Sequence, residues 1–312
     1  MTDARAWQPL KLTPGDLGVS ADLDGLLGYL DATDVAPALT EHRALLFSGF
    51  EADEQALDRI AARLLPRRLA YVHGNSPRTK VGDNIYTSTE FPAEYDISMH
   101  NELSYAHTWP SRLLFFCAQP AESGGATPLI HGGLWLEEVG QEIRDAVRDG
   151  LYYRQYLHGG RGLGKSWQET FETADRDEVE EFLVLSEATW KWTGSGGLKV
   201  GQVRPATVRH PETGEEVWFS QLDQWHAAAL GEETMRELMA VLPEDELPQS
   251  VTFADGSPIP AHYALHVRRT GLELAVDVAW RRADVLLIDN VAVGHGRRAF
   301  TGGRKVLVAM SG

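Results

Sequence analysis

Short apolar runs with strand-like composition occur along most of the chain. In the first half they lie at residues 42–50, 69–73, 84–89, 97–105, 112–119 and 127–132. In the second half they lie at 151–158, 189–193, 201–210, 216–222, 284–289 and 305–312. The runs are rich in β-branched and aromatic residues and are separated by Pro, Gly or Asp, which is typical of the strands of a β-rich domain.

Apolar residues at helical spacing predict a smaller number of helices. These helices are expected at 55–65, 134–148 and 167–183, with two or three more between 225 and 280. Strands at both ends of the chain, with helices inserted between them, favour a β core that closes on itself over a doubly wound sheet. We therefore expect one mainly β domain over residues 1–312, with outer helices and a helical or lid insertion at approximately 134–280.

Composition and charge exclude several classes of protein to which the chain could otherwise belong. The chain of 312 residues is 43% apolar and carries a net charge of −16, which opposes binding to nucleic acid. No apolar run approaches the roughly 20 residues of a membrane span, and residues 1–10 lack a signal-peptide core, so we expect a cytoplasmic protein without a membrane partner. The single cysteine, Cys117, excludes an internal disulfide and a multi-cysteine metal cluster.

The stretch GGRGLGKS at residues 159–166 fits the pattern of a phosphate-binding loop. The run DVLLID at 284–289 could supply the Mg²⁺-binding acid, Asp289. A phosphate-binding loop normally joins the first core strand to its helix, whereas 158 residues precede this one and no regular strand-helix alternation follows. A nucleotide hydrolase is thus a distant alternative, and we expect a Gly-rich lid loop near the substrate entrance.

Two histidines and a carboxylate form a candidate metal site. In a strand over 97–105, His100 and Glu102 would point to the same face, and His295 follows the apolar run 284–289. Two His and one carboxylate leave coordination positions open and are typical of non-haem Fe(II) oxygenases. A 2-oxo acid bound there would need a cation for its distal carboxylate, and Arg304 is the candidate. A non-catalytic metal-binding module of the same fold is the second alternative.

The sequence resembles the taurine dioxygenase (TauD/TfdA-like) family of Fe(II)- and 2-oxoglutarate-dependent oxygenases. The resemblance is strongest to the branch that hydroxylates amino acids in natural-product biosynthesis. The matching blocks, in the family's order, are residues 85–132, 210–221, 284–300 and 302–312. The resemblance implies a double-stranded β-helix, or jelly roll, with Fe(II), 2-oxoglutarate and O₂ as cofactor and cosubstrates.

The resemblance also assigns residues to the site. The implied iron ligands, which are also the catalytic residues, are His100, Glu102 and His295. Thr127 and Arg304 fall on the family's 2-oxoglutarate-binding positions, with Lys305 as a neighbouring alternative to Arg304. Glu102 stands where most of the wider family has Asp, and a retained carboxylate argues against a halogenase. Val308 stands where taurine dioxygenase has the Arg that binds the substrate sulfonate, which argues against taurine as the substrate.

The implied reaction is oxidative decarboxylation of 2-oxoglutarate coupled to hydroxylation of an unactivated C–H bond. We expect an amino acid or amino-acid-derived substrate, free or tethered to a carrier protein; desaturation and epoxidation use the same ligands and stay open. Four residues are candidates for substrate contacts: Asn84, Tyr86, Ser88 and Arg298. The first three alternate along the predicted strand that precedes the metal site, and Arg298 follows His295 closely.

Overall fold

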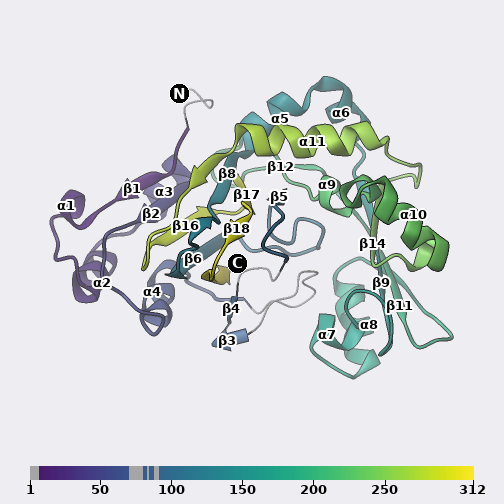
Figure 1. The fold of residues 1–312 in the computed structure, drawn as a ribbon, viewed down its shortest axis with the longest axis horizontal. Helices are drawn as coiled ribbons and strands as arrows, with labels where there is room; N and C mark the ends of the chain where they lie inside the picture. Colours follow the sequence, from purple (N-terminus) through teal and green to yellow (C-terminus); the bar gives the residue numbers. More distant parts are fainter. Residues whose placement is uncertain (1–6, 70–79, 83, 88–90) are drawn as a thin grey trace.

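The fold is described by a computed structural model, which places residues 7–69, 80–82, 84–87 and 91–312. Its core consists of two facing sheets (Figure 1). The larger sheet has the order β1 (Leu10–Leu12), β2 (Ala44–Phe47), β16 (Val285–Asp289), β6 (Arg112–Gln119), β19 (Lys305–Ser311), β4 (Ile85–Thr87) and β3 (Lys80–Gly82). The smaller sheet has the order β15 (Val276–Val278), β8 (Thr127–His131), β17 (Val293–Arg297) and β5 (Ile97–His100). Except for the parallel pair β1–β2, these strands pair antiparallel, and the predicted jelly-roll core is confirmed.

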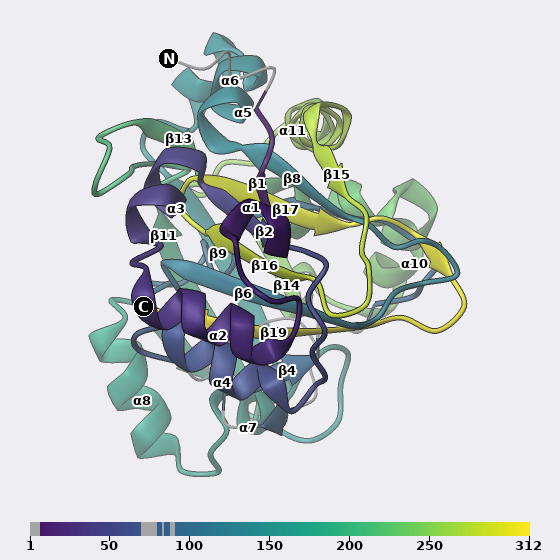
Figure 2. The ribbon, with the colours of Figure 1, turned by 90° about the vertical axis from the view of Figure 1, so that its left-hand side faces the viewer.

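Alternation along β6 divides the core into two layers. Phe115 and Cys117 face the smaller sheet and pack with residues such as Met99 and Leu129. Leu114 and Phe116 face outward and pack on helices α2 (Leu23–Ala32) and α4 (Ala56–Leu64), which lie across the larger sheet in Figure 2. Burial, aided by the charge of Asp284, raises the pKa of Cys117 to about 12, which keeps the thiol protonated and unreactive.

Helices α5 (Gly132–Val139) and α11 (Ala261–Leu274) cover the outer face of the smaller sheet (Figure 1). The indole of Trp135 on α5 packs against Gly294 of β17, where a Cβ atom would lie 3.0 Å from the ring. Gly294 therefore permits close packing of the helix on the strand that carries the next residue, His295.

The insertion between β8 and β15 contains a further four-stranded sheet as well as helices, on the right-hand side of Figure 1. Its strands, in spatial order, are β10 (Thr189–Trp192), β11 (Leu198–Arg204), β9 (Leu151–Leu157) and β14 (Gln249–Phe253). A hairpin joins β12 (Thr207–Arg209) to β13 (Glu216–Trp218). The insertion thus contains strands in addition to the expected helices, and β15, close to its predicted end, belongs to the core.

Several predicted elements are shorter than their apolar runs, because local breakers interrupt them. The expected helix 134–148 divides into α5 and α6 (Gln141–Ala146) at Gly140, which has a φ of 87°. The expected helix 167–183 divides into α7 (Trp167–Phe171) and α8 (Arg176–Leu185). The run 201–210 is broken at Pro205, since proline lacks the N–H that a strand ladder needs. Most of the predicted strand 69–73 lies outside the described residues.

The remaining helical elements lie in the N-terminal part of the chain and in the insertion. They are α1 (Pro14–Leu17), α3 (Ala36–His42), α9 (Leu222–Trp225), α10 (Glu232–Val241) and the 3₁₀ turns η2 (Ala227–Leu230) and η3 (Glu244–Glu246). The short pair β7 (Ser123–Gly124) and β18 (Phe300–Thr301) closes one end of the core. Among the residues placed by the structure, no helix combines the length and apolar character that a membrane span requires.

Candidate metal centre

The structure brings His100, Glu102 and His295 together. The antiparallel pairing of β5 and β17 sets His100 opposite His295, with ring centroids 4.3 Å apart. His295 Nε2 lies 3.9 Å from Glu102 Oε2, and one ligand atom from each of the three residues lies within 4.8 Å of the others. The predicted group of residues is therefore assembled. The expected strand geometry is wrong, however, because β5 ends at His100 and Glu102 lies in the turn that follows.

The donor set and its burial fit a ferrous ion. His100, Glu102 and His295 are 8%, 3% and 4% exposed, and the ring of Phe115 lies 5.4 Å from that of His295. Two imidazoles and one carboxylate suit Fe(II) and leave positions for other ligands. The apolar wall beside His295 limits the access of water to the site.

Asn290 positions the turn that carries Glu102. Its Oδ1 accepts a hydrogen bond of 2.7 Å from the backbone N–H of Glu102, and its Nδ2 donates to the carbonyls of Glu102 at 3.1 Å and Pro110 at 2.8 Å. Asn101 in the same turn donates from Nδ2 to the carbonyl of Asn290 at 2.7 Å. Asn290 and Asn101 are both 0% exposed, so this connection between two distant segments is fully buried.

The carbonyl of Ser98 sets the orientation of the His100 ring. It lies 3.0 Å from His100 Nδ1 and also accepts a hydrogen bond of 3.0 Å from Nε2 of Gln224. Nε2 of Gln224 also lies 3.1 Å from His100 Nδ1, so Nδ1 contacts both Ser98 and Gln224, and Nε2 is the ring nitrogen that could bind a metal. Gln224, on α9, thus connects the insertion to a candidate iron ligand.

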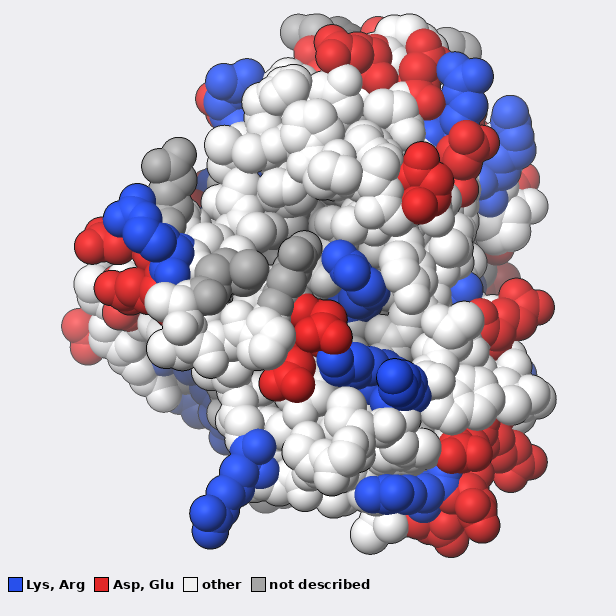
Figure 3. Space-filling view, turned by 90° about the vertical axis from the view of Figure 1, so that its right-hand side faces the viewer, with Lys and Arg blue, Asp and Glu red and all other residues white. Residues whose placement is uncertain are grey.

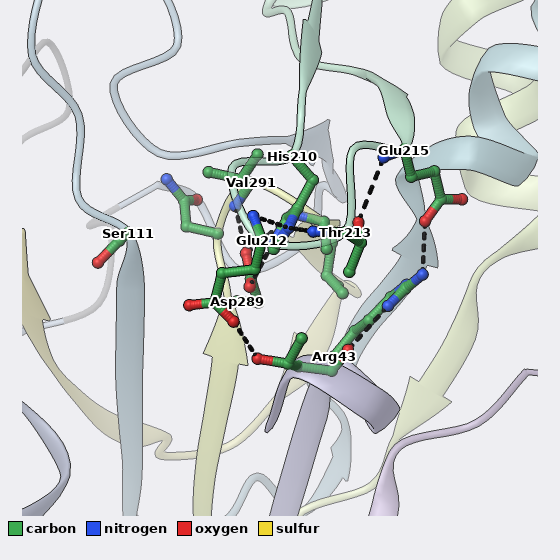
Figure 4. Close-up of polar contacts among 12 residues, drawn as sticks. Arg43, Ser111, His210, Glu212, Thr213, Glu215, Asp289 and Val291 are labelled. Carbon is green, nitrogen blue, oxygen red and sulfur yellow. Dashed lines mark hydrogen bonds and ion pairs between the residues drawn. The ribbon is translucent and has the colours of Figure 1, made fainter. Parts of the chain in front are cut away.

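A polar network at the end of β16 holds the segment that leads to His295 (Figure 4). Asp289 Oδ1 accepts hydrogen bonds from the N–H groups of Val291 at 2.9 Å and Ala292 at 3.0 Å. Asp289 Oδ2 lies 2.8 Å from Nε2 of His210, which comes from the β12–β13 hairpin. This hairpin, predicted to be a structural connection, fixes the turn that contains Asn290. The structure gives Asp289 this structural contact, not a place beside a phosphate-binding loop.

The network continues to His131 at the end of β8. Arg43 donates from Nε to His131 Nε2 at 2.7 Å and from Nη2 to Glu215 at 2.5 Å. His131 Nδ1 accepts hydrogen bonds from the N–H groups of Gly133 and Leu134. Donors therefore face both ring nitrogens. Burial lowers the pKa of His131, and Arg43 lowers it further against the opposing charge of Glu215.

Thr127 and Arg304, the candidate 2-oxoglutarate ligands, lie near one end of the core. Thr127 is 3% exposed, and its Oγ1 accepts a hydrogen bond of 3.0 Å from Nε1 of Trp280. Arg304 donates from Nε to the carbonyl of Gly125, two residues before Thr127, at 2.9 Å. Burial, together with the positive charge of Arg297, lowers the pKa of Arg304 to about 10. An anionic carboxylate beside Arg304 would offset both effects.

Lys305 points away from this pair. Its ammonium forms an ion pair of 2.5 Å with Glu54, next to α4 on the outer side of the larger sheet. Val306 and Val308, by contrast, pack into the inner core. The structure therefore separates the two alternatives: the guanidinium of Arg304 lies beside Gly125, and Lys305 contacts the opposite layer.

The four candidate substrate residues lie in different settings. Tyr86 is buried in the inner core, opposite Val308 in the pairing of β4 with β19. Asn84 precedes β4 with a φ of 53°, so it does not alternate with Tyr86 in a strand. Ser88 lies outside the described residues. The guanidinium of Arg298 contacts Asp277 at 2.8 Å, Asp96 at 3.5 Å and the backbone carbonyl of Leu272 at 3.0 Å.

The Gly-rich loop at 159–166 does not have the setting of a phosphate-binding loop. Strand β9, which precedes it, pairs antiparallel with β11 and β14, whereas the phosphate-binding arrangement needs a parallel sheet. Leu163 of this loop lines a cavity of about 210 Å³ together with Gln224 and Trp225. The loop therefore borders a cavity that reaches Gln224, next to Ser98 and His100.

Sequence reasoning missed the residues that hold the ligands in place. Asn290, Gln224 and Trp280 each form hydrogen bonds with a partner more than 100 positions away, at separations of 188, 126 and 153 residues. The only local signal was an Asn directly after the apolar run 284–289. Asn is common in turns, so that signal does not identify a residue that supports a metal ligand.

Comparison with known proteins agrees with this geometry. The family described as "Taurine catabolism dioxygenase TauD, TfdA family" matches residues 9–310. Dapdiamide synthesis protein DdaC from Enterobacter agglomerans is 35% identical over 274 residues, which cover 87% of this chain and 83% of that protein. A clavaminate synthase-like protein from Arabidopsis thaliana is 31% identical over 292 residues, which cover 90% of this chain and 84% of that one.

The fold resembles that of PvcB from Pseudomonas aeruginosa, with a TM-score of 0.51 and 16% identity. The match covers 99% of this chain and 88% of PvcB. A second PvcB structure, described as an Fe, alpha-ketoglutarate dependent oxygenase from an isonitrile synthetic pathway, matches with the same TM-score over 99% and 89% of the two chains. The chain belongs to the TauD/TfdA family of dioxygenases, which depend on Fe(II) and 2-oxoglutarate and use O₂.

Proposed function

We propose that the chain hydroxylates an unactivated C–H bond of an amino acid or amino-acid-derived molecule in natural-product biosynthesis, with the substrate free or tethered to a carrier protein. The observation that carries the proposal is the buried cluster of His100, Glu102 and His295 within 4.8 Å. The name of the related DdaC protein links it to dapdiamide synthesis, which supports an amino-acid-derived substrate class. Val308 is 0% exposed within the core, so this position supplies no cation for a sulfonate.

In this proposal, His100, Glu102 and His295 hold the iron, and Thr127 and Arg304 bind the distal carboxylate of 2-oxoglutarate. Bound Fe(II) supplies the activation of O₂ that is coupled to decarboxylation of 2-oxoglutarate. The side chains named above would hold the iron and 2-oxoglutarate in the orientation that the reaction needs. Arg304 remains protonated at neutral pH, because its lowered pKa is still about 10. Burial of the three ligands keeps water from the reacting groups.

Succinate formation with a panel of substrates tests the proposal. The purified chain with Fe(II), 2-oxoglutarate and O₂ would be incubated with free amino acids, amino-acid amides and aminoacyl groups on a carrier protein. We expect substrate-dependent succinate and a product heavier by one oxygen atom for at least one member. The Glu102→Ala variant is the negative control. The proposal would be contradicted if no member of the panel stimulated succinate formation. It would also be contradicted if Glu102→Ala formed an oxidised product at the wild-type rate.

A further inference from the structure

Three cationic side chains share the outer face of the insertion sheet. Lys191 on β10 lies directly opposite Lys199 on β11, and Lys199 lies diagonally across from Arg154 on β9. Side chains that are opposite across antiparallel strands have Cβ atoms about 5 Å apart, and diagonal neighbours are about 7–8 Å apart. Figure 3 shows the side of the molecule that carries the insertion, where Lys and Arg side chains gather near the centre beside acidic ones.

The charges of this cluster are incompletely neutralised. Lys199 forms an ion pair with Asp245 and, by its hydrogen bond and charge, lowers the pKa of that carboxyl, an effect to which the charge of Arg154 adds. Nε of Arg154 is buried and has no hydrogen-bond partner within the part of the chain that the structure describes. Two lysines directly opposite each other destabilise a sheet, and a buried guanidinium nitrogen without a partner adds a desolvation cost. Among the described residues, three cations face one acid here, and this local excess of positive charge would attract an anion.

The cluster also lines a cavity. Arg154, Lys191 and Lys199 surround a cavity of about 240 Å³ together with Tyr152 and Ser250. Gly201 keeps room for the Tyr152 ring, because a Cβ atom at this position would lie 2.1 Å from the phenol oxygen. The two hydroxyl groups add hydrogen-bond donors to the guanidinium and the ammonium groups. This combination of donors is suited to a phosphate or carboxylate group.

From these observations we propose that the outer face of the insertion sheet is an anion-binding site, separate from the metal centre, for a small molecule with a phosphate or carboxylate group. Leu247 and Ser250 line both this cavity and the apolar cavity that reaches Gln224. A ligand with an apolar part next to its anionic group would therefore fit the pair of cavities. None of the residues that line the cationic cavity is among the proposed ligands of iron or 2-oxoglutarate.

Calorimetric titration of the whole chain with inorganic pyrophosphate and, separately, with citrate tests the site at constant ionic strength. We expect saturable binding of at least one probe, weakened roughly tenfold or more in the double variant Arg154→Gln/Lys191→Gln, because charge-assisted hydrogen bonds are lost. The matched control is Arg59→Gln/Arg148→Gln, which removes two exposed cations elsewhere and should bind as the wild type does. Thermal unfolding of each variant verifies folding without reference to activity.

Two results would overturn the inference. One is the absence of saturable binding of both probes to the wild-type chain. The other is equal affinity in the wild type and in Arg154→Gln/Lys191→Gln. If the double variant fails to fold, Lys191→Gln alone, on an exposed side chain, replaces it with the same criterion.

Discussion

Replacing Asn290 with Ala tests whether a buried contact from the β16–β17 turn positions the carboxylate of Glu102. The Asn290 side chain forms three hydrogen bonds of 2.7–3.1 Å with the backbone of Glu102 and Pro110. All three disappear in Asn290→Ala, while the backbone carbonyl that accepts from Asn101 is retained. The substitution therefore releases the turn that carries Glu102 without changing any candidate ligand.

The expected magnitude follows from these contacts. A buried polar group that loses its partner costs about 1–3 kcal/mol, and the three losses here share one side chain and are not additive. We expect the free energy of unfolding to fall by about 2–4 kcal/mol. Residues that support metal ligands typically change metal affinity by about 10–100-fold, so Fe(II) binding should weaken in that range.

Urea unfolding of the metal-free chain and anaerobic titration with Fe(II) measure the two effects. The control is Asp22→Ala, which removes the N-cap hydrogen bond to Gly25 of α2, far from the site in the sequence. This control should lose about 1 kcal/mol of stability and keep the wild-type Fe(II) affinity. If Asn290→Ala loses stability but binds Fe(II) as tightly as the control does, the assignment of a positioning role to Asn290 is refuted.

Three further predictions concern the cosubstrate site and the pH dependence of stability. Arg304→Gln should raise the KM for 2-oxoglutarate about tenfold or more, and Lys305→Gln should leave it nearly unchanged, measured by succinate formation; equal effects would contradict the assignment. Trp280→Phe removes the donor to Thr127 and should lower the free energy of unfolding by about 1 kcal/mol in urea. The lowered pKa of His131 means that the unfolded chain binds a proton more readily, so stability should fall as the pH drops below about 6.5. Urea unfolding at pH 7.5 and 5.5 should show a smaller loss in His131→Gln than in the wild type.

The sequence could predict the identity of the site because its chemistry depends on residue type and order. His100 lay within the run 97–105, part of which became β5, and His295 followed the run 284–289, which became β16. Glu102 was predicted for a reason that was partly wrong: its spacing of two residues from His100 suggested that both lie in one strand, but β5 ends at His100. The turn after His100 brings the carboxylate to the same place because Asn290 holds its backbone.

Long-range pairing limited the rest of the prediction. The apolar run 151–158 predicted β9 correctly, but nothing local showed that β9 would pair with β11 and β14 to form a separate sheet. The strand β15 has only three residues, too few for an apolar pattern to predict it, and it is held in place by its pairing with β8. Contacts such as Gln224 with Ser98 arise from tertiary packing, which residue spacing along the chain does not reveal.

The central claim is that His100, Glu102 and His295 hold the iron of a 2-oxoglutarate-dependent dioxygenase. Anaerobic addition of Fe(II) and then 2-oxoglutarate, followed by visible absorption, tests this claim most directly. We predict a charge-transfer band in the wild type and in Lys165→Ala, a substitution in the Gly-rich loop, and no band in His295→Ala. Absence of the band in the wild type, or its persistence in His295→Ala, would contradict the claim.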